Sequence, residues 1–335
     1  MNETSTPRIG VIGAGPWGKN HVRNFHTLGA LRAVCDTNPA AIAAATSGLT
    51  GVAGHTSAES FFSAKDIDAV VIATPAATHG GLVARAVAAG KHVLVEKPLC
   101  LDVEEADRLA RQAKQSGLLL MVGHLLLYHP AFRAVLNLAR TGALGKLRYV
   151  YSNRLSLGRI RKEENALWSF APHDISMILA LATRMPNSVT ATAGYYVSKD
   201  VADTTLSQLS FDDGMQAHVF VSWLHPYKDH RMVVVGSDAM VSFDDTRTGA
   251  EKVQMYRHAV GWNGEVPILS RANAEPVPYG DEEPLQLECR TFLDCIRTGT
   301  VPPSDANEGI RVLRVLDACQ KAIGSGTRIE LPRNT

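Results

Sequence analysis

The sequence feature that most constrains the fold is a glycine-rich turn directly after the first apolar run. Ile9–Ile12 reads as a buried strand, and Gly13, Gly15 and Gly18 follow it with the spacing G-x-G-x-x-G. This spacing allows a tight turn, a close approach of the backbone to a pyrophosphate, and a helix that begins near Pro16 with its N-terminus toward that anion. We expect a dinucleotide to bind here; the alternative is a similar fold that binds another ligand.

An acidic residue after the next strand bears on the choice of dinucleotide. Asp36 ends the apolar run Leu31–Cys35 and lies 18 residues beyond Gly18. A carboxylate at this place can accept hydrogen bonds from both hydroxyls of the adenosine ribose, and it would repel a 2′-phosphate. The sequence therefore favours NAD over NADP.

The first third of the chain alternates short apolar runs with helical patterns. Gly81–Ala89 and Val103–Ser116 have helical spacing, and Asp102 with Glu105 forms a capping box before the second. Runs that are apolar at nearly every position are typical of parallel strands covered on both faces. The further runs are Ala69–Ala73, His92–Val95 and Leu118–Val122. We expect an α/β fold here, a doubly wound parallel sheet in a domain spanning residues 1–123.

The remainder, residues 124–335, predicts an α+β domain with a large, mostly antiparallel open sheet. Strand-like stretches follow one another, with one helical insertion around Ala171–Ala182 and long loops or edge strands over 244–284. Two helices end the chain, Leu285–Arg297 and Glu308–Ile323 closed by Gly324, and they could pack back on the first domain. The strand candidates are Leu147–Leu157, Val189–Val197, Thr204–Phe211, Met215–Trp223, Met232–Val235 and Met240–Phe243.

Composition excludes several classes of protein. The net charge of +1 gives no reason to expect nucleic acid or an anionic membrane as a partner, and no apolar run is long enough to span a bilayer. Five scattered cysteines without a CxxC pair predict neither a disulfide framework nor a metal site. We expect a cytoplasmic protein.

Polar residues end two further strands of the predicted parallel sheet. Thr74 and Pro75 follow the run that ends at Ala73, on the edge where such sheets bind ligands, and His79 either contacts the cofactor or is an ordinary loop residue. Glu96 and Lys97 end the run His92–Val95, and Pro98 prevents the strand from continuing. A Lys–Glu contact at a strand end is more often a solvated ion pair than a catalytic one.

In combination with other motifs of the sequence, Glu96 and Lys97 favour a catalytic contact over a solvated ion pair. The glycine fingerprint, E-K-P at residues 96–98 and the α+β second half resemble the glucose–fructose oxidoreductase, inositol dehydrogenase and rhizopine-catabolism (Gfo/Idh/MocA) family over nearly the whole chain. The resemblance implies an NAD-dependent sugar dehydrogenase or ketoreductase. It further implies that Lys97 contacts the oxygen of the reacting carbon and that His173 is the proton acceptor.

The family pattern at this histidine reads Asp, three residues, His, and the chain departs from it. Ser169 stands in the place of the aspartate, and Asp174 follows His173. Either the Ser169 hydroxyl contacts the substrate instead, or Asp174 orients the network from another side. The structural alternative for His173 is a helix cap after Pro172.

The expected reaction moves a hydride between the nicotinamide and a secondary alcohol or ketone carbon of a sugar, with Lys97 and His173 handling the oxyanion and the proton. The segment W-S-F-A-P-H-D at residues 168–174 resembles segments of family members from sugar-nucleotide and deoxysugar pathways. Basic clusters at Arg159–Lys162 and around Lys228 and Arg231 are consistent with a nucleotide-linked substrate, or are simply solvated. The alternatives are a free cyclitol or monosaccharide dehydrogenase, and a non-catalytic NAD-binding regulator.

The candidate site residues fall into two further groups. The expected cofactor-binding residues are Gly13, Gly15, Pro16, Trp17, Gly18, Asp36, Thr74, Pro75, His79, Glu96 and Lys97. The expected substrate-binding residues are His124, Tyr128, Arg154, Asn165, Trp168, Ser169 and Asp174. The exposed face of an antiparallel sheet needs cover, so we also expect a homodimer or homotetramer formed through the C-terminal sheet.

Overall fold

The computed structural model describes residues 6–158 and 160–332. The chain divides into two compact units, each of which takes in two separate stretches of the sequence. Unit 1 runs to Tyr128 and includes Glu282–Leu313, and unit 2 comprises His129–Asp281 with the residues from Arg314 onward. Unit 1 therefore contains a late segment of the chain in addition to the stretch that the glycine fingerprint opens.

Unit 1 is built on a parallel six-stranded sheet with the order β3-β2-β1-β4-β5-β6. Its strands are β1 (Ile9–Ile12), β2 (Leu31–Cys35), β3 (Ala53–His55), β4 (Ala69–Ile72), β5 (His92–Glu96) and β6 (Leu120–Gly123). All pairs are parallel, which confirms the predicted doubly wound sheet. Strand β3 escaped prediction because it is a three-residue edge strand without a buried residue to give it a pattern.

Helices connect the strands of unit 1. They are α1 (Pro16–Thr27), α2 (Pro39–Thr46), α3 (Ala58–Phe62), α4 (His79–Ala88) and α5 (Val103–Gln115), with the 3-10 turns η1 (Ala76–Thr78) and η2 (Leu125–Tyr128). The predicted cap of α5 is confirmed, since the Asp102 carboxylate accepts a hydrogen bond of 2.7 Å from the Glu105 backbone N–H.

A helix from the far end of the chain completes unit 1. Helix α8 (Pro284–Thr298) packs against α1 and η2. Phe25 of α1 meets Phe292 of α8 edge to face, with ring centroids 6.4 Å apart, and Arg23 forms an ion pair with Glu283. The buried face of α8 thus belongs to the core of unit 1, behind the first helix after the glycine turn.

Unit 2 is built on a nine-stranded sheet with the order β16-β13-β12-β11-β7-β10-β9-β8-β17. Neighbouring strands are antiparallel except β7 and β10, so the predicted mostly antiparallel sheet is confirmed. The strands are β7 (Leu147–Leu155), β8 (Ser188–Gly194), β9 (Thr204–Ser210), β10 (Gln216–Ser222), β11 (Asp229–Gly236), β12 (Met240–Asp244), β13 (Val253–Tyr256), β16 (Glu275–Pro276) and β17 (Ile329–Glu330).

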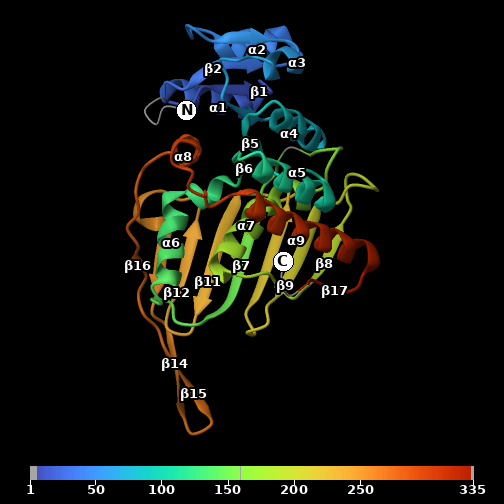
Figure 1. The fold of residues 1–335 in the computed structure, drawn as a ribbon. Helices are drawn as coiled ribbons and strands as arrows, with labels where there is room; N and C mark the ends of the chain where they lie inside the picture. Colours follow the sequence, from blue (N-terminus) through green and yellow to red (C-terminus); the bar gives the residue numbers. More distant parts are fainter. Residues whose placement is uncertain (1–5, 159, 333–335) are drawn as a thin grey trace. The chain divides into compact units, whose positions relative to one another are not determined.

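Helices cover one face of this sheet. Helix α6 (Pro130–Arg140) packs against α7 and β12, and α7 (Ala166–Ala182) packs against β7, β9 and β10 (Figure 1). The last helix, α9 (Ala306–Ser325), continues through Gly324, and Gly326 with φ of 67° follows it, so the predicted closure at Gly324 is wrong by two residues. The opposite face of the sheet is not covered by these helices.

The start of α7 also differs from the prediction. The helix begins at Ala166 and contains Pro172, whereas the sequence predicted a helix from about Ala171. A proline usually ends or kinks a helix because it lacks the N–H group, and its position therefore indicated a boundary. The actual start is set by Asn165, whose side chain accepts a hydrogen bond of 3.2 Å from the Trp168 backbone N–H.

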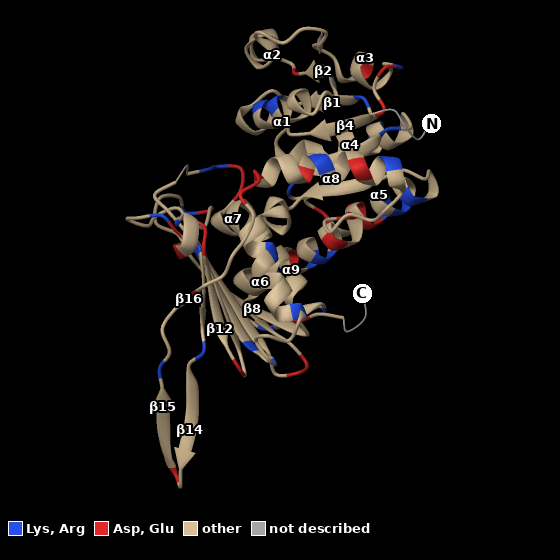
Figure 2. Cartoon of the chain, turned by 90° about the vertical axis from the view of Figure 1, so that its left-hand side faces the viewer, with Lys and Arg blue, Asp and Glu red and all other residues tan. Residues whose placement is uncertain are grey.

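A separate hairpin extends from unit 2 between β13 and β16. Strands β14 (Ala259–Asn263) and β15 (Val266–Ser270) pair only with each other, and Figures 1 and 2 show them reaching away from the nine-stranded sheet. Val260 pairs with Leu269 and Trp262 with Pro267, so these four side chains share one face. All residues of the hairpin strands are exposed.

Over the described residues, no helix combines the length and the apolar character that crossing a membrane requires.

Candidate active site

The glycine turn has the geometry that a bound pyrophosphate needs. A Cβ atom on Gly13 would lie 2.6 Å from the Ala73 carbonyl oxygen, and one on Gly18 would lie 1.7 Å from the Gly13 carbonyl oxygen, so neither position accepts a side chain. Gly13 also has a φ of 96°, which glycine adopts without strain. A Cβ on Gly15, in contrast, would meet nothing within 4 Å, which leaves open space over the turn.

The first turn of α1 faces this open space with free backbone donors. Gly15 is the N-cap of α1 and contributes no side-chain cap, Pro16 begins the helix, and Trp17 is 45% exposed. The uncapped N–H groups at a helix N-terminus attract anions. These residues therefore fit the diphosphate of a dinucleotide.

Asp36 is held at the end of β2, beside the turn. One carboxylate oxygen accepts a hydrogen bond of 2.7 Å from the Ala14 backbone N–H, and the other accepts one of 2.9 Å from the Asn38 backbone N–H. The side chain is therefore fixed against the glycine turn, and its charge lies at the edge of the sheet where the adenosine ribose is expected.

His79 joins two of the loops at this edge. Its Nδ1 lies 2.7 Å from the Pro98 carbonyl oxygen and its Nε2 lies 2.9 Å from the Thr74 carbonyl oxygen, and the side chain is 1% exposed. Both ring nitrogens are thus occupied by backbone groups, which favours a positioning role for His79 over direct contact with the cofactor. Thr74 and Pro75 themselves follow β4, and the Thr74 and Thr78 hydroxyls are 2.7 Å apart.

Glu96 ends β5, and its carboxylate is held by His21 of α1. Its Oε1 lies 2.8 Å from Nε2 of His21 on α1, and its Oε2 accepts a hydrogen bond of 3.3 Å from the Lys97 backbone N–H. Burial alone would raise the pKa of Glu96, but the hydrogen bond from His21 and the charges of His21 and Lys97 outweigh it and lower that pKa. Glu96 is therefore an anion at neutral pH.

Lys97 follows Glu96 directly and is half-buried. It leaves the same edge of the parallel sheet as the glycine turn after β1, Asp36 after β2 and Thr74 after β4. The peptide bond to Pro98 is cis. The carboxyl edge of this sheet thus brings a fixed carboxylate and a lysine to the place where doubly wound sheets bind dinucleotides.

Two expected substrate residues in unit 1 lie in its interior instead. Nδ1 of His124 is 2.5 Å from a Glu308 carboxylate oxygen, and the Tyr128 hydroxyl is 2.8 Å from the Ser304 hydroxyl. Both side chains are almost fully buried, and burial raises the pKa of Tyr128. These contacts favour a positioning role over direct contact with substrate.

The sequence prediction also missed two buried titratable residues of unit 1, His21 and Glu288. His21 lies on the buried stripe of α1 with Gly18, Val22 and Phe25, and Glu288 lies on the buried stripe of α8. A histidine or a glutamate at an apolar position of an amphipathic helix was the signal that could have found them, because such residues are seldom buried without a partner or a purpose.

In unit 2, the residues expected around the histidine share one helix face. Asn165, Ser169 and His173 follow one another at intervals of four residues along α7, which places them in one row. The capping interpretation of His173 is wrong, because His173 lies in the middle of α7. Asn165 and the Trp168 indole N–H both donate hydrogen bonds to the Gln320 side chain, at 2.8 and 3.1 Å.

Asp174 faces the sheet. Its carboxylate accepts hydrogen bonds from Arg154 at 2.7 Å and from Ser152 at 2.5 Å, and both partners lie on β7. Asp174 is 0% exposed and Arg154 8% exposed, so this is a buried ion pair that fastens α7 to the sheet. These contacts favour an anchoring role for Arg154 and Asp174 over contact with substrate.

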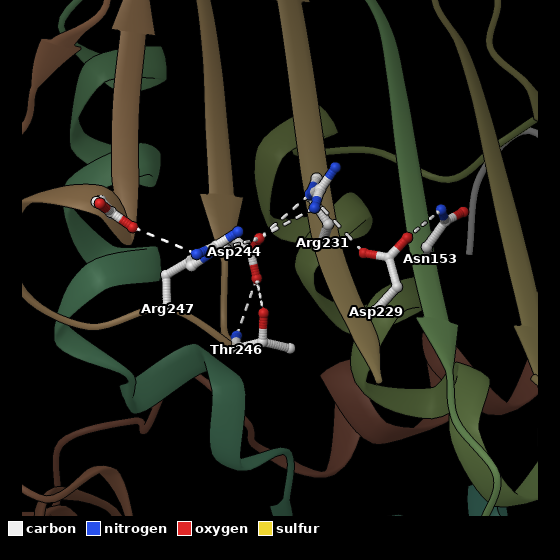
Figure 3. A network of polar contacts seen from close by, with 7 residues as sticks. Asn153, Asp229, Arg231, Asp244, Thr246 and Arg247 are labelled. Atoms are coloured by element: carbon white, nitrogen blue, oxygen red, sulfur yellow. Dashed lines mark hydrogen bonds and ion pairs between the residues drawn. The ribbon is translucent and has the colours of Figure 1, made fainter. Parts of the chain in front are cut away.

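One arginine in each basic cluster is paired with acidic side chains. Arg159 lies outside the described residues, and Arg161 forms an ion pair of 2.5 Å with Glu164. Figure 3 shows Arg231 between two acids on the uncovered side of the nine-stranded sheet: it lies 3.2 Å from Asp244 and 3.7 Å from Asp229. Asp229 in turn accepts a hydrogen bond of 2.9 Å from Asn153. Paired arginines have less charge to offer a phosphate.

Two other kinds of site find little support in the described part of the chain. No three histidine, cysteine or acidic side chains there are grouped so as to hold a metal ion. A cavity of about 590 Å³ in unit 1 is lined by His92, Leu119, Cys295 and Val301 among others. His92 begins β5, so this cavity lies at the amino edge of the sheet, opposite to Lys97.

Comparison with known proteins agrees with this geometry. Residues 7–124 match a family described as "Oxidoreductase family, NAD-binding Rossmann fold", and residues 132–242 match the "GFO/IDH/MocA C-terminal domain". Together the two matches cover well over half of the chain.

Individual relatives act on sugars and cyclitols. The chain is 29% identical to the UDP-N-acetylglucosamine 3-dehydrogenase of Acidithiobacillus ferrooxidans, over 91% of this chain and 94% of that protein. It is also 29% identical to an inositol 2-dehydrogenase of Rhizobium meliloti, over 97% and 99% of the two chains. A solved structure of the Acidithiobacillus enzyme matches with a TM-score of 0.83 and 28% identity, covering 95% and 97%. The chain therefore belongs to the Gfo/Idh/MocA family of NAD-binding oxidoreductases.

Proposed function

We propose that this protein transfers a hydride between a nicotinamide cofactor and a secondary alcohol or ketone carbon of a sugar, and that the sugar is nucleotide-linked. The observation that carries the proposal is the position of Lys97, which leaves the same sheet edge as the glycine turn, next to a carboxylate fixed by His21.

The proposed chemistry divides the work between cofactor and protein. The nicotinamide, when bound, accepts the hydride from the carbon or returns it. In the oxidative direction, His173 accepts the proton of the hydroxyl group, and the Lys97 ammonium donates a hydrogen bond to the oxygen as negative charge develops there. Glu96 holds Lys97 in position. In the reductive direction His173 returns the proton to the oxygen.

The substrate class rests on the relatives and on one helix. A relative that covers nearly the whole chain is named for a UDP-sugar, and another of similar identity is named for inositol. The row of Asn165, Ser169 and His173 offers an amide, a hydroxyl and an imidazole at helical spacing, which suits the hydroxyl groups of a sugar ring. A free cyclitol or monosaccharide is the second candidate for the same site.

We infer NAD rather than NADP as the cofactor because of Asp36. Its carboxylate is fixed by two backbone N–H groups, and the two residues that follow it, Thr37 and Asn38, carry no positive charge to receive a 2′-phosphate.

We further propose that the chain forms homodimers or homotetramers through unit 2. The face of the nine-stranded sheet opposite to α6 and α7 carries large exposed side chains, including Tyr149 and Leu206, which are 44% and 47% exposed. The β14–β15 hairpin adds Trp262 and Leu269, which are exposed to 68% and 65%. A second copy of the chain would remove these surfaces from water.

The test is an assay of nicotinamide reduction and oxidation against sugars, cyclitols and nucleotide sugars. We expect turnover with at least one nucleotide sugar, and a loss of about 10²-fold or more in kcat for Lys97→Met and for His173→Asn. Turnover of free cyclitols alone would favour the second candidate.

NADH binding is the control measurement for these two variants. Both should bind NADH nearly as tightly as the wild type, because the diphosphate and ribose contacts are made elsewhere. Tight NADH binding by the wild type without turnover of any compound would contradict the enzyme proposal and favour a nucleotide-sensing regulator.

A further inference from the structure

One side of α8 carries an acid where an apolar residue is expected. Leu285, Glu288, Cys289 and Phe292 follow the spacing i, i+3, i+4, i+7 and are all buried. Glu288 is 0% exposed, and neither of its carboxylate oxygens has a hydrogen-bond partner among the described residues. A carboxylate in this state is costly, because buried charges are normally paired or hydrogen-bonded.

Glu288 belongs to the cluster that anchors Glu96. Sγ of its neighbour Cys289 lies 3.8 Å from Nδ1 of His21, whose Nε2 lies 2.8 Å from Glu96. Helix α8 packs against α1 and η2, so the groups on these elements and on the adjoining strand edge surround it. The titratable and charged groups on or next to these elements are Lys19, His21, Arg23, His26, Glu96, Lys97, His124, Tyr128, Glu283, Cys289, Arg290, Asp294, Cys295 and Arg297, and Glu308 of α9 is bound to His124.

Among the described residues, Glu288 has no hydrogen-bond partner, and neighbouring basic groups are bound to other acids. Arg23 pairs with Glu283 at the exposed start of α8, and His124 pairs with Glu308. His21 directs its Nε2 at Glu96. Arg23 and the two imidazoles are thus engaged by other acids.

Electrostatics separate the two buried acids. Burial raises the pKa of Glu288 well above the usual value, and the negative charge of Glu96 raises it further. Glu96 moves the other way, because His21 and Lys97 outweigh its burial. Two carboxyl groups that interact in this manner share their protons unequally: one stays an acid and the other a carboxylate.

We propose that Glu288 is an uncharged, proton-bearing acid at neutral pH, and that it acts as a positioning residue for Lys97 through Glu96. While Glu288 is uncharged, Glu96 is the carboxylate next to Lys97 that bears the charge, and Nε2 of His21 is directed at it. Ionisation of Glu288 would create a second buried anion that competes for His21 and displaces Glu96. The role toward Lys97 rests on the proposed function, whereas the bound proton does not.

The bound proton is tested through stability against pH. Glu288→Gln has nearly the same shape and is neutral at every pH. Because the folded pKa of Glu288 is raised, the wild type gains most from this group below the unfolded pKa of about 4.3 and loses that gain as pH rises toward the folded value. As pH rises across this window, the equilibrium constant for unfolding of the wild type should therefore increase relative to that of the variant by up to about tenfold per pH unit.

Urea denaturation of both proteins between pH 5 and pH 8.5 measures the difference. A difference in unfolding free energy that stays the same at every pH would reflect packing alone, whatever its sign. That result would overturn the proposal. Glu283→Gln is the matched control: it lies at the start of the same helix but is exposed, and it should show no comparable trend. Infrared spectra at pH 7 give a second readout. A protonated carboxylic acid has a C=O stretching band that a carboxylate lacks, and the band of Glu288 should be present in the wild type and absent from Glu288→Gln.

The positioning role is tested by the pH profile of kcat with a substrate found in the panel. The wild type should lose activity on the alkaline side as Glu288 gives up its proton, and Glu288→Gln should lack this decline. The same decline in both proteins would overturn the positioning role. If Lys97→Met keeps its turnover while the stability trend holds, the proposed function fails but the buried neutral acid stands.

Discussion

At the scale of single residues, the proposed preference for NAD rests on one carboxylate. Asp36 does two things at once: it accepts hydrogen bonds from Ala14 and Asn38, which fix the end of β2 against the glycine turn, and it brings a negative charge to the ribose end of the site. These two effects can be separated, because asparagine keeps an acceptor but loses the charge.

We predict that Asp36→Asn narrows the preference for NAD over NADP by about tenfold or more, since removing the charge removes the repulsion of a 2′-phosphate. Asp36→Ala should in addition weaken NAD binding, because both backbone contacts and the ribose contacts are lost. Fluorescence titration with NADH and NADPH measures both effects. Equal affinity of the wild type for the two cofactors would contradict the assignment.

A second residue, His230, predicts a pH dependence of stability. Burial and the charges of Arg154 and Lys228 lower the pKa of His230 to about 4. Its unfolded pKa is near 6.5, so between these values the unfolded chain binds more protons and stability falls as pH is lowered from about 6.5 to about 4. We expect this group to contribute roughly 2 kcal/mol to that fall, less than the full shift because the side chain is partly exposed.

His230→Asn should reduce the acid sensitivity, since an amide does not bind the extra proton. Thermal unfolding at intervals from pH 7 to pH 4.5 measures the difference. His218 offers a comparison on the same sheet: burial alone lowers its pKa, without a neighbouring cation. An identical acid limb in wild type and His230→Asn would assign the loss of stability to other groups.

At the scale of elements, helix α7 combines an anchor to the sheet with the row of residues that we propose contacts the substrate. Asp174 fastens the helix to β7 through Arg154 and Ser152, while Asn165, Ser169 and His173 lie in a row on α7. The family spacing of Asp, three residues, His is therefore a helical spacing, and Ser169 occupies the matching place on the same face as His173.

We predict that Asn165→Ala destabilises the protein by about 1 kcal/mol, because it removes the N-cap of α7, and that it lowers kcat in addition. Asp102→Ala is the matched control, since Asp102 caps α5 through a similar hydrogen bond of 2.7 Å to Glu105. It should cost about as much stability but leave turnover nearly unchanged. Urea denaturation and steady-state kinetics separate the two outcomes; equal kinetics in both variants would exclude a special role for the start of α7.

The fold was predictable where the pattern is local. Strands β1, β2, β4 and β5 were predicted nearly residue by residue, because a run of four or five residues that is apolar at nearly every position is typical of a buried parallel strand. The glycine turn and Glu96–Lys97 followed from the rule that ligands bind at the carboxyl edge of such sheets.

The other contacts of the candidate site depend on packing between segments that are distant in the sequence. Hydrophobic periodicity does not predict such packing. His21 reaches Glu96 across 75 residues, and Glu308 reaches His124 across 184. Pro172 also misled the prediction of α7, since its missing N–H usually marks a boundary and here lies within a helix that tertiary contacts hold. Burial of the expected substrate residues His124, Tyr128, Arg154 and Asp174 was equally invisible in the sequence.

At the scale of the whole molecule, the exposed apolar surface is concentrated in unit 2. An isolated two-stranded hairpin is marginally stable in water, yet β14–β15 presents Val260, Trp262, Pro267 and Leu269 together on one face. Figure 2 shows few charged residues along these strands.

We predict that Trp262→Asp combined with Leu269→Asp shifts the protein to a smaller assembly, because charge on this face opposes its burial against a second copy. Analytical ultracentrifugation over a range of concentrations measures the change. Tyr227→Asp is the control: Tyr227 is 64% exposed but lies outside the hairpin. A wild-type protein that remains monomeric at high concentration would contradict self-association through unit 2.

The division of unit 1 into two stretches of sequence has a consequence for its synthesis. Residues up to Tyr128 leave the ribosome before residues 129–281, and only then does α8 follow. At about 5–20 residues per second this delay is roughly 10–30 s. During that time the first helix has no Phe292 to pack on, and the histidine behind Glu96 faces water. The sheet edge that carries Glu96 and Lys97 is thus synthesised early, whereas α8 follows later, so the newly made chain exposes an unfinished core during this interval.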